Sequence, residues 1–150
     1  MNDSRRVIDS MPAMPFKALD KSADASISVW LIEDNHSFRN TIARLLNQVP
    51  GFSCSHSFSN SEDALETLSN GAVPDVALVD VELPGMNGIQ AVRRMKSMSP
   101  ATRIIMLTVF DDHDKIFKAV CAGASGYLLK TAPVETIVDS IREVYNGGAP

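Results

Sequence analysis

Short runs of apolar residues recur along the chain, and segments with apolar residues at helical spacing separate them. Short apolar runs bounded by turn residues are typical of strands buried on both faces of a sheet. The predicted strands cover residues 27–33, 52–58, 75–80, 103–108 and 126–129. The predicted helices begin near residues 37, 61, 87, 112 and 133 and end near residues 49, 70, 97, 122 and 145. Strands that alternate with helices predict an α/β fold with a parallel sheet and crossover helices.

The second predicted strand has a pattern of its own. Phe52, Cys54, His56 and Phe58 alternate with serines. Period-two alternation predicts one packed face and one wetter face, as in a strand at the edge of a sheet. We therefore expect His56 to be packed on the apolar side of this strand.

Polar residues lie at the carboxyl ends of four of the predicted strands. Glu33 ends the first strand and Asp34 follows it, Asp80 ends the third, Thr108 ends the fourth and Lys130 follows the fifth. Ligands of open parallel sheets bind outside the carboxyl ends of the strands, so these side chains are expected to converge. Clustered carboxylates repel each other and raise each other's pKa values, and a divalent cation such as Mg²⁺ relieves this repulsion. Acids beside a lysine indicate a site for a cation and a phosphoryl group.

Taken in order, these motifs resemble the receiver domains of two-component response regulators. The resemblance rests on Glu33-Asp34, on Asp80 with Leu83-Pro84-Gly85-Met86-Asn87-Gly88 after it, on Thr108, and on Gly126-Tyr127-Leu128-Leu129-Lys130. It covers residues 26–148 and implies a flavodoxin-like (βα)5 fold, a doubly wound five-stranded parallel sheet of order 2-1-3-4-5. The first and third strands are then neighbours, which places Asp34 beside Asp80.

The resemblance implies a role for each residue of the site. Asp80 is expected to be the phosphoacceptor, with Lys130 and Thr108 contacting phosphoryl oxygens. Mg²⁺ is the expected cofactor, held by Asp34 and Asp80, by Glu33 directly or through water, and by the backbone carbonyl of Glu82. The expected donor is a phosphohistidine on a sensor histidine kinase or phosphotransfer protein. The domain would catalyse this transfer and the later hydrolysis itself, as a signalling phosphoacceptor rather than an enzyme acting on external substrates.

The resemblance also implies an output. Thr108 and Tyr127 are the expected switch residues, and they act on the face made by the fourth helix, the fifth strand and the fifth helix (α4-β5-α5 in the fold's own order). Phosphorylation is expected to favour a homodimer. The closing stretch from Tyr127 to Pro150 resembles receivers of the LuxR/FixJ type, which continue into a helix-turn-helix DNA-binding domain that controls transcription. Val109 departs from the small residue common after the hydroxyl, and we expect it to narrow access to Asp80.

Composition and charge limit the classes of partner and the cellular location that we expect. The chain has 150 residues, 45% of them hydrophobic, and a formal net charge of −4, which argues against direct nucleic-acid binding by this chain. No apolar run approaches the length of a membrane span. Cys54 and Cys121 have neither metal-ligand spacing nor a disulfide framework, so we expect two buried thiols and a cytoplasmic location. Residues 1–25 are expected to form a flexible N-terminal extension, and residues 149–150 to start a linker to an absent output domain.

Two other functions compete with this interpretation. A degenerate receiver would act only as a phosphorylation-independent protein-interaction module, and the intact Asp80, Thr108 and Lys130 argue against it. A Mg²⁺-dependent phosphohydrolase commonly carries its two acids two residues apart near the first strand. Asp80-Val81-Glu82 lies on the third strand and fits that arrangement poorly.

Overall fold

The computed structural model describes residues 26–148, and these contain one parallel sheet of five strands. The strands are β2 (Ile27–Ile32), β3 (Phe52–Phe58), β4 (Val76–Asp80), β5 (Arg103–Thr108) and β6 (Gly126–Leu129). Their order in the sheet is β3-β2-β4-β5-β6, which confirms the predicted order 2-1-3-4-5. The expectations for residues 1–25 and 149–150 lie outside the described residues.

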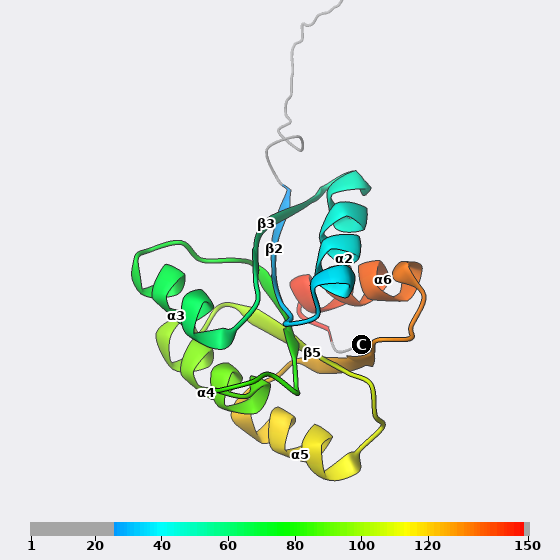
Figure 1. Ribbon diagram of the computed structural model, residues 1–150. Coiled ribbons are helices and arrows are strands. Elements are labelled where there is room, and N and C mark those ends of the chain that lie inside the picture. Colours follow the sequence, from blue (N-terminus) through cyan, green and yellow to red (C-terminus); the bar gives the residue numbers. More distant parts are fainter. Residues whose placement is uncertain (1–25, 149–150) are drawn as a thin grey trace, which may run out of the picture.

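Five helices in the described part cover the two faces of the sheet. They are α2 (His36–Gln48), α3 (Ser61–Ser69), α4 (Gly88–Met98), α5 (His113–Ala122) and α6 (Val134–Tyr145). Helices α2 and α6 lie on one face, and α3, α4 and α5 lie on the other (Figure 1). Among residues 26–148, no helix has the length and apolar character that crossing a bilayer requires.

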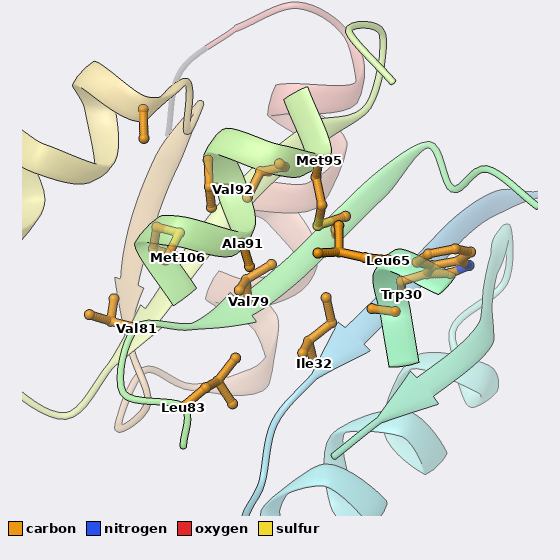
Figure 2. Packing of buried hydrophobic residues seen from close by; sticks show 14 of the residues in the cluster. Trp30, Ile32, Leu65, Val79, Val81, Leu83, Ala91, Val92, Met95 and Met106 are labelled. Carbon is orange, nitrogen blue, oxygen red and sulfur yellow. The ribbon is translucent and has the colours of Figure 1, made fainter. Parts of the chain in front are cut away.

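The sheet has a packed layer on each face because its central strands carry unbroken apolar runs before their polar ends: residues 29–32 in β2, 76–79 in β4 and 104–107 in β5. On the α3-α4-α5 side, Trp30, Val79 and Met106 pack against Leu65 and Met95 (Figure 2). On the α2-α6 side, the core contains Val29, Leu31, Leu78, Ile105, Leu107, Leu46, Ile137 and Ile141. Burying each large apolar side chain stabilises the fold by roughly 1.5–3 kcal/mol. This two-sided burial fixes where the strands end, and therefore where the polar residues lie.

Short polar side chains set where four of the helices begin. Asn35, Asn60, Asn87 and Asp112 are the N-caps of α2, α3, α4 and α5, and each side chain accepts backbone N–H hydrogen bonds. Such caps satisfy the free N–H groups of the first helical turn. Helix α5 ends at Gly123, which has a φ of 115° that glycine adopts without strain.

The edge strand β3 departs from the predicted pattern. Its register with β2 shifts between Val29 and Trp30, so that Cys54 pairs with Val29 whereas His56 pairs with Trp30. Ser55 is therefore an extra residue, as in a β-bulge. Because the bulge inverts the alternation, Cys54 packs on the α2-α6 side and Phe58 on the α3-α4-α5 side.

Two smaller expectations were wrong. His56 is exposed, although its ring stacks on Phe58 at 5.7 Å and meets the edge of Trp30 at 5.2 Å. Cys121 is exposed on α5 and Cys54 is half-buried, so the two cysteines are not both buried thiols. Burial raises the pKa of the Cys54 thiol to about 11.

Candidate functional site

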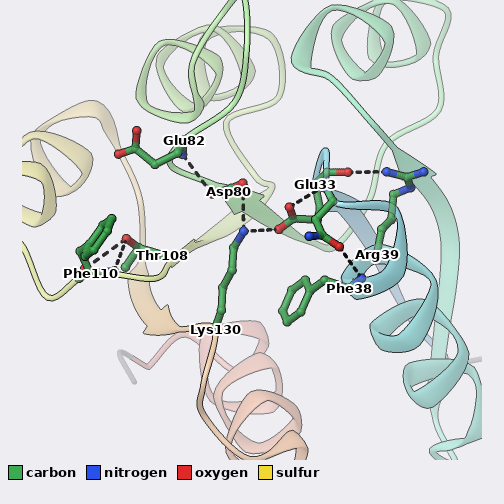
Figure 3. A network of polar contacts seen from close by, with 9 residues as sticks. Glu33, Phe38, Arg39, Asp80, Glu82, Thr108, Phe110 and Lys130 are labelled. Atoms are coloured by element: carbon green, nitrogen blue, oxygen red, sulfur yellow. Dashed lines mark hydrogen bonds and ion pairs between the residues drawn. The ribbon is translucent and has the colours of Figure 1, made fainter.

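The carboxyl ends of β2, β4, β5 and β6 bring the predicted residues to one edge of the sheet. Carboxylate oxygens of Glu33, Asp34 and Asp80 all lie within 4.8 Å of one another. Lys130 reaches into this group from the end of β6 (Figure 3). The strand order explains the convergence, because β2 and β4 are neighbours although Asp34 and Asp80 are far apart in the sequence.

Glu33 is fully buried, and each of its carboxylate oxygens contacts one protein group. Its Oε1 lies 2.7 Å from Lys130 Nζ, and its Oε2 accepts a hydrogen bond from the Asn35 backbone N–H at 2.9 Å. The guanidinium of Arg39 donates to the Glu33 backbone carbonyl at 2.7 Å. Asp34, next in the chain, is exposed. One acid of the pair is therefore fixed inside the protein, and the other is open to solvent.

Asp80 is 2% exposed, and its two carboxylate oxygens have different partners. Oδ2 lies 3.0 Å from Lys130 Nζ, and Oδ1 accepts a hydrogen bond from the Glu82 backbone N–H at 3.0 Å. Burial raises the pKa of Asp80 to about 6, with a smaller contribution from the nearby charge of Glu33. The hydrogen bonds from Glu82 and Lys130 oppose this rise in pKa. The predicted upward direction is confirmed for Asp80, but burial contributes more than repulsion between acids.

Lys130 links the acids to the carboxyl end of β5. Its backbone N–H donates to the Thr108 carbonyl at 2.8 Å, which continues the pairing of β5 and β6 past the last strand residue. Burial lowers the pKa of its ammonium, but the hydrogen bonds to Glu33 and Asp80 and the negative charges of these two acids together outweigh burial and raise the pKa. The ammonium also lies 5.3 Å from the centre of the Phe38 ring. Lys130 is therefore a positive charge held between the Glu33 and Asp80 carboxylates.

Thr108 is buried at the end of β5, and its hydroxyl bonds to the backbone that follows it. The hydroxyl donates to the Phe110 carbonyl at 3.1 Å and accepts from the Phe110 N–H at 3.1 Å. The side chains of Val109 and Phe110 point outward and are 54% and 64% exposed. Tyr127 is 37% exposed on the neighbouring strand β6. Val109 is therefore a surface residue, and its effect on access to Asp80 stays a prediction.

The loop after Asp80 is held by close backbone packing and by helix α3. A Cβ atom on Gly88 would lie 2.0 Å from the Asp80 carbonyl oxygen, so only glycine fits there. The Ser61 hydroxyl donates to the Met86 carbonyl at 3.0 Å, and Glu62 accepts from the Met86 N–H at 3.1 Å. These contacts fix the backbone on which Asp80 is placed.

Comparisons with known proteins agree with this geometry. A family model described as the response regulator receiver domain matches residues 29–142. The chain belongs to this family. The chain is 37% identical over 121 residues to the response regulator UvrY of Escherichia coli K12, covering 81% of this chain and 55% of UvrY. It is 32% identical over 121 residues to the response regulator GacA of Pseudomonas aeruginosa, with 81% and 56% covered. The chain thus spans about half the length of the curated relatives it matches.

Solved receiver structures show the same fold. The signal receiver domain of a NarL response regulator from Mycobacterium tuberculosis superposes with a TM-score of 0.76 at 28% identity, covering 81% of this chain and 98% of that one. A LuxR-family two-component response regulator from Aurantimonas sp. SI85-9A1 gives a TM-score of 0.77 at 27% identity, covering 83% and 88%. The receiver fold and the relationship to LuxR-type regulators are therefore confirmed.

Several residues around this receiver site were not singled out from the sequence. Phe38 and Arg39 lie on α2 beside Lys130 and Glu33, and Lys115 of α5 forms an ion pair with the Glu82 side chain. A phenylalanine at helical spacing predicts a core position, and nothing in its spacing indicates a lysine partner. The sequence could have indicated Gly88, because this glycine is the last residue of the Pro84-Gly85-Met86-Asn87-Gly88 motif.

The donor set fits a hard divalent cation. Glu33, Asp34 and Asp80 offer only carboxylate oxygens, which are the ligands that Mg²⁺ prefers. One exposed acid leaves room for the water molecules that Mg²⁺ usually retains. The buried negative charge exceeds what a single lysine neutralises, so a cation would find an electrostatically favourable position here.

Proposed function

We propose that this receiver accepts a phosphoryl group on Asp80 and controls a transcriptional output through it. One observation carries the proposal: a carboxylate that is 2% exposed lies 3.0 Å from a lysine ammonium and within 4.8 Å of two further acids. This arrangement suits a carboxylate nucleophile with a cation beside the incoming phosphoryl charge. The family relationship supports the same assignment.

The chemistry assigns one role to each side of the cluster. Glu33, Asp34, Asp80 and the backbone carbonyl of Glu82 would hold Mg²⁺, which when bound neutralises negative charge on the acids and the phosphoryl group. A carboxylate oxygen of Asp80 forms the new O–P bond while the P–N bond of a donor phosphohistidine breaks and the imidazole leaves. Lys130 would pair with a phosphoryl oxygen, and its 3.0 Å contact with Asp80 Oδ2 supports this role. Hydrolysis of the aspartyl phosphate by water later resets the receiver.

Thr108 and Tyr127 would transmit the change. To donate its hydroxyl to a phosphoryl oxygen, Thr108 must give up the Phe110 carbonyl. The cavity between Thr108, Phe110 and Tyr127 has a volume of about 10 Å³, which is far too small for a phenol ring. Inward movement of Thr108 would open this space to Tyr127. A charge-assisted hydrogen bond contributes roughly 1.5–3 kcal/mol, against roughly 0.5–1.5 kcal/mol for the neutral bond that it replaces. A net gain of about 1.4 kcal/mol shifts a two-state equilibrium about tenfold.

The partners follow from the same proposal. The donor is a sensor histidine kinase or a phosphotransfer protein, and the location is the cytoplasm. Phosphorylation favours a homodimer through the face formed by α5, β6 and α6, which is the α4-β5-α5 face in the fold's own order. The transcriptional output would act through a helix-turn-helix DNA-binding domain, and residues 26–148 themselves would not bind DNA. The curated relatives are about twice as long as the matched region, which leaves room in them for a further domain.

Labelling with a small phosphodonor tests the proposal. We expect acetyl phosphate with Mg²⁺ to add about 80 Da, the mass of one phosphoryl group, to the wild-type protein. Asp80→Asn should remain unlabelled. Asp139→Asn is the control, because Asp139 is an exposed acid on α6 with a 79% exposed side chain, and it should label like the wild type.

The other outcomes separate the competing functions. Equal labelling of wild type and Asp80→Asn would remove the central claim. No labelling of the wild type would favour a phosphorylation-independent interaction module. Release of phosphate from phosphorylated substrates without stoichiometric labelling would favour a phosphohydrolase.

The cation site and the switch have their own tests. Mg²⁺ titration by calorimetry should show weaker binding in Asp34→Ala, and an unchanged affinity would remove Asp34 from the ligand set.

Thr108→Ala should still accept phosphate, but light scattering should show little dimerisation with beryllofluoride, a phosphoryl mimic. An equal response of wild type and Thr108→Ala would disprove the coupling through Thr108.

A further inference from the structure

Lys130 has a third neighbour besides its two acids. The ammonium lies 2.7 Å from Glu33 Oε1, 3.0 Å from Asp80 Oδ2 and 5.3 Å from the centre of the Phe38 ring (Figure 3). An ammonium within about 6 Å of a ring centroid is attracted by the negative face of the aromatic ring. The side chain of Lys130 is 15% exposed, so this attraction acts where little water competes.

Helix α2 fixes the position of the Phe38 ring. The Phe38 backbone N–H donates to the N-cap Asn35 Oδ1 at 2.9 Å, and the Asn35 N–H donates to Glu33 Oε2 at 2.9 Å. The phenylalanine side chain also packs against the core on the α2-α6 side of the sheet. The helix cap and the acid that binds Lys130 are therefore part of one hydrogen-bonded chain, which sets the distance between ring and ammonium.

We propose that Phe38 is a positioning residue that holds the Lys130 ammonium at the phosphorylation site through its ring face. This inference rests on the proposed function, because it concerns how Lys130 is kept ready for the phosphoryl group. Glu33 and Asp80 are also the acids available to a hard cation, whereas an aromatic ring does not bind such an ion. The Phe38 ring is therefore the neighbour of Lys130 that a divalent cation does not compete for. A lysine held in one place loses less side-chain entropy when it binds.

Graded fluorination of the ring tests the proposal without changing its shape. Fluorine atoms withdraw electron density from the ring face, so mono-, di- and trifluorophenylalanine at position 38 should progressively slow phosphorylation by acetyl phosphate. We expect a total loss of about two- to fivefold at saturating donor, with Mg²⁺ affinity unchanged. Phe52 provides the matched control. Its ring centre lies 5.0 Å from the Arg142 guanidinium carbon, at the amino end of β3 and away from the site. Fluorination of Phe52 should leave the phosphorylation rate unchanged.

The outcomes separate positioning from packing. A rate that falls with each added fluorine supports the proposal. If Phe38→Leu slows phosphorylation but fluorination has no effect, Phe38 acts only by packing and the proposal is overturned. Equal rates for the unsubstituted and trifluorinated proteins overturn it as well.

A second measurement keeps the test independent of phosphorylation. The ε-methylene protons of Lys130 should show an upfield NMR shift from the Phe38 ring in the unphosphorylated protein, and Phe38→Leu should remove it. If the wild type does not label with acetyl phosphate, the proposed function fails, while the NMR shift still decides whether Phe38 holds Lys130. Protons at their ordinary position in the wild type would overturn the inference even if Asp80 labels normally.

Discussion

Replacing Asp80 with asparagine should make the metal-free protein more stable at neutral pH. Asparagine has nearly the same shape as aspartic acid but carries no charge. The pKa of Asp80 rises from 3.8 to about 6, chiefly because the carboxylate is buried. A carboxyl group whose pKa is higher in the folded state contributes stability below pH 3.8, and this contribution is lost as the pH rises through about 6. Ionised Asp80 therefore destabilises the empty receiver.

The magnitude follows from the pKa. Each pKa unit corresponds to about 1.4 kcal/mol, so the rise from 3.8 to about 6 costs about 3 kcal/mol once Asp80 is fully ionised. We expect the free energy of unfolding of Asp80→Asn to exceed that of the wild type by about 3 kcal/mol at pH 7.5. At pH 4 the difference should be well under 1 kcal/mol. Other groups titrate over this range too, but they are common to both proteins and cancel in the difference.

Urea unfolding followed by fluorescence measures this difference. Trp30 is the single tryptophan of the chain and is 1% exposed, so it reports the loss of the core. Mg²⁺ should stabilise the wild type at pH 7.5 more than it stabilises Asp80→Asn, because the cation compensates the charge that the variant lacks. Equal stability of the two proteins at pH 7.5, or a difference that does not grow between pH 4 and pH 7.5, would refute the reasoning.

Three further predictions concern other parts of the molecule. Gly88→Ala should destabilise the fold by about 2–4 kcal/mol in urea titrations and slow labelling of Asp80, because its Cβ would meet fixed backbone atoms. Asn87→Ala should cost about 1 kcal/mol in the same assay, since it removes the capping box of α4, and an unchanged unfolding midpoint would contradict this. Cys121 should react with a maleimide much faster than Cys54, whose pKa of about 11 and burial suppress the thiolate; mass mapping of the labelled cysteine distinguishes them.

The sequence by itself determined the elements and the edge of the sheet at which the site lies. Continuous apolar runs are buried on both faces of a parallel sheet, so their polar ends must lie outside the carboxyl ends of the strands. For this reason Glu33, Asp80, Thr108 and Lys130 could be assigned before any contact was known. The predicted helix and strand boundaries agree with the structure to within a residue because caps such as Asn87 and Gly123 are local signals.

The tertiary structure decided what depends on neighbours from other parts of the chain. The Ser55 bulge turns Cys54 and Phe58 to opposite faces, because register with β2 overrides the period-two pattern of β3. Gly88 is required only because its backbone approaches Asp80 closely. The contact of Phe38 with Lys130 joins the first described helix to the end of the last strand. Such contacts arise from the order and packing of the strands, so they cannot be predicted from residue spacing along one segment.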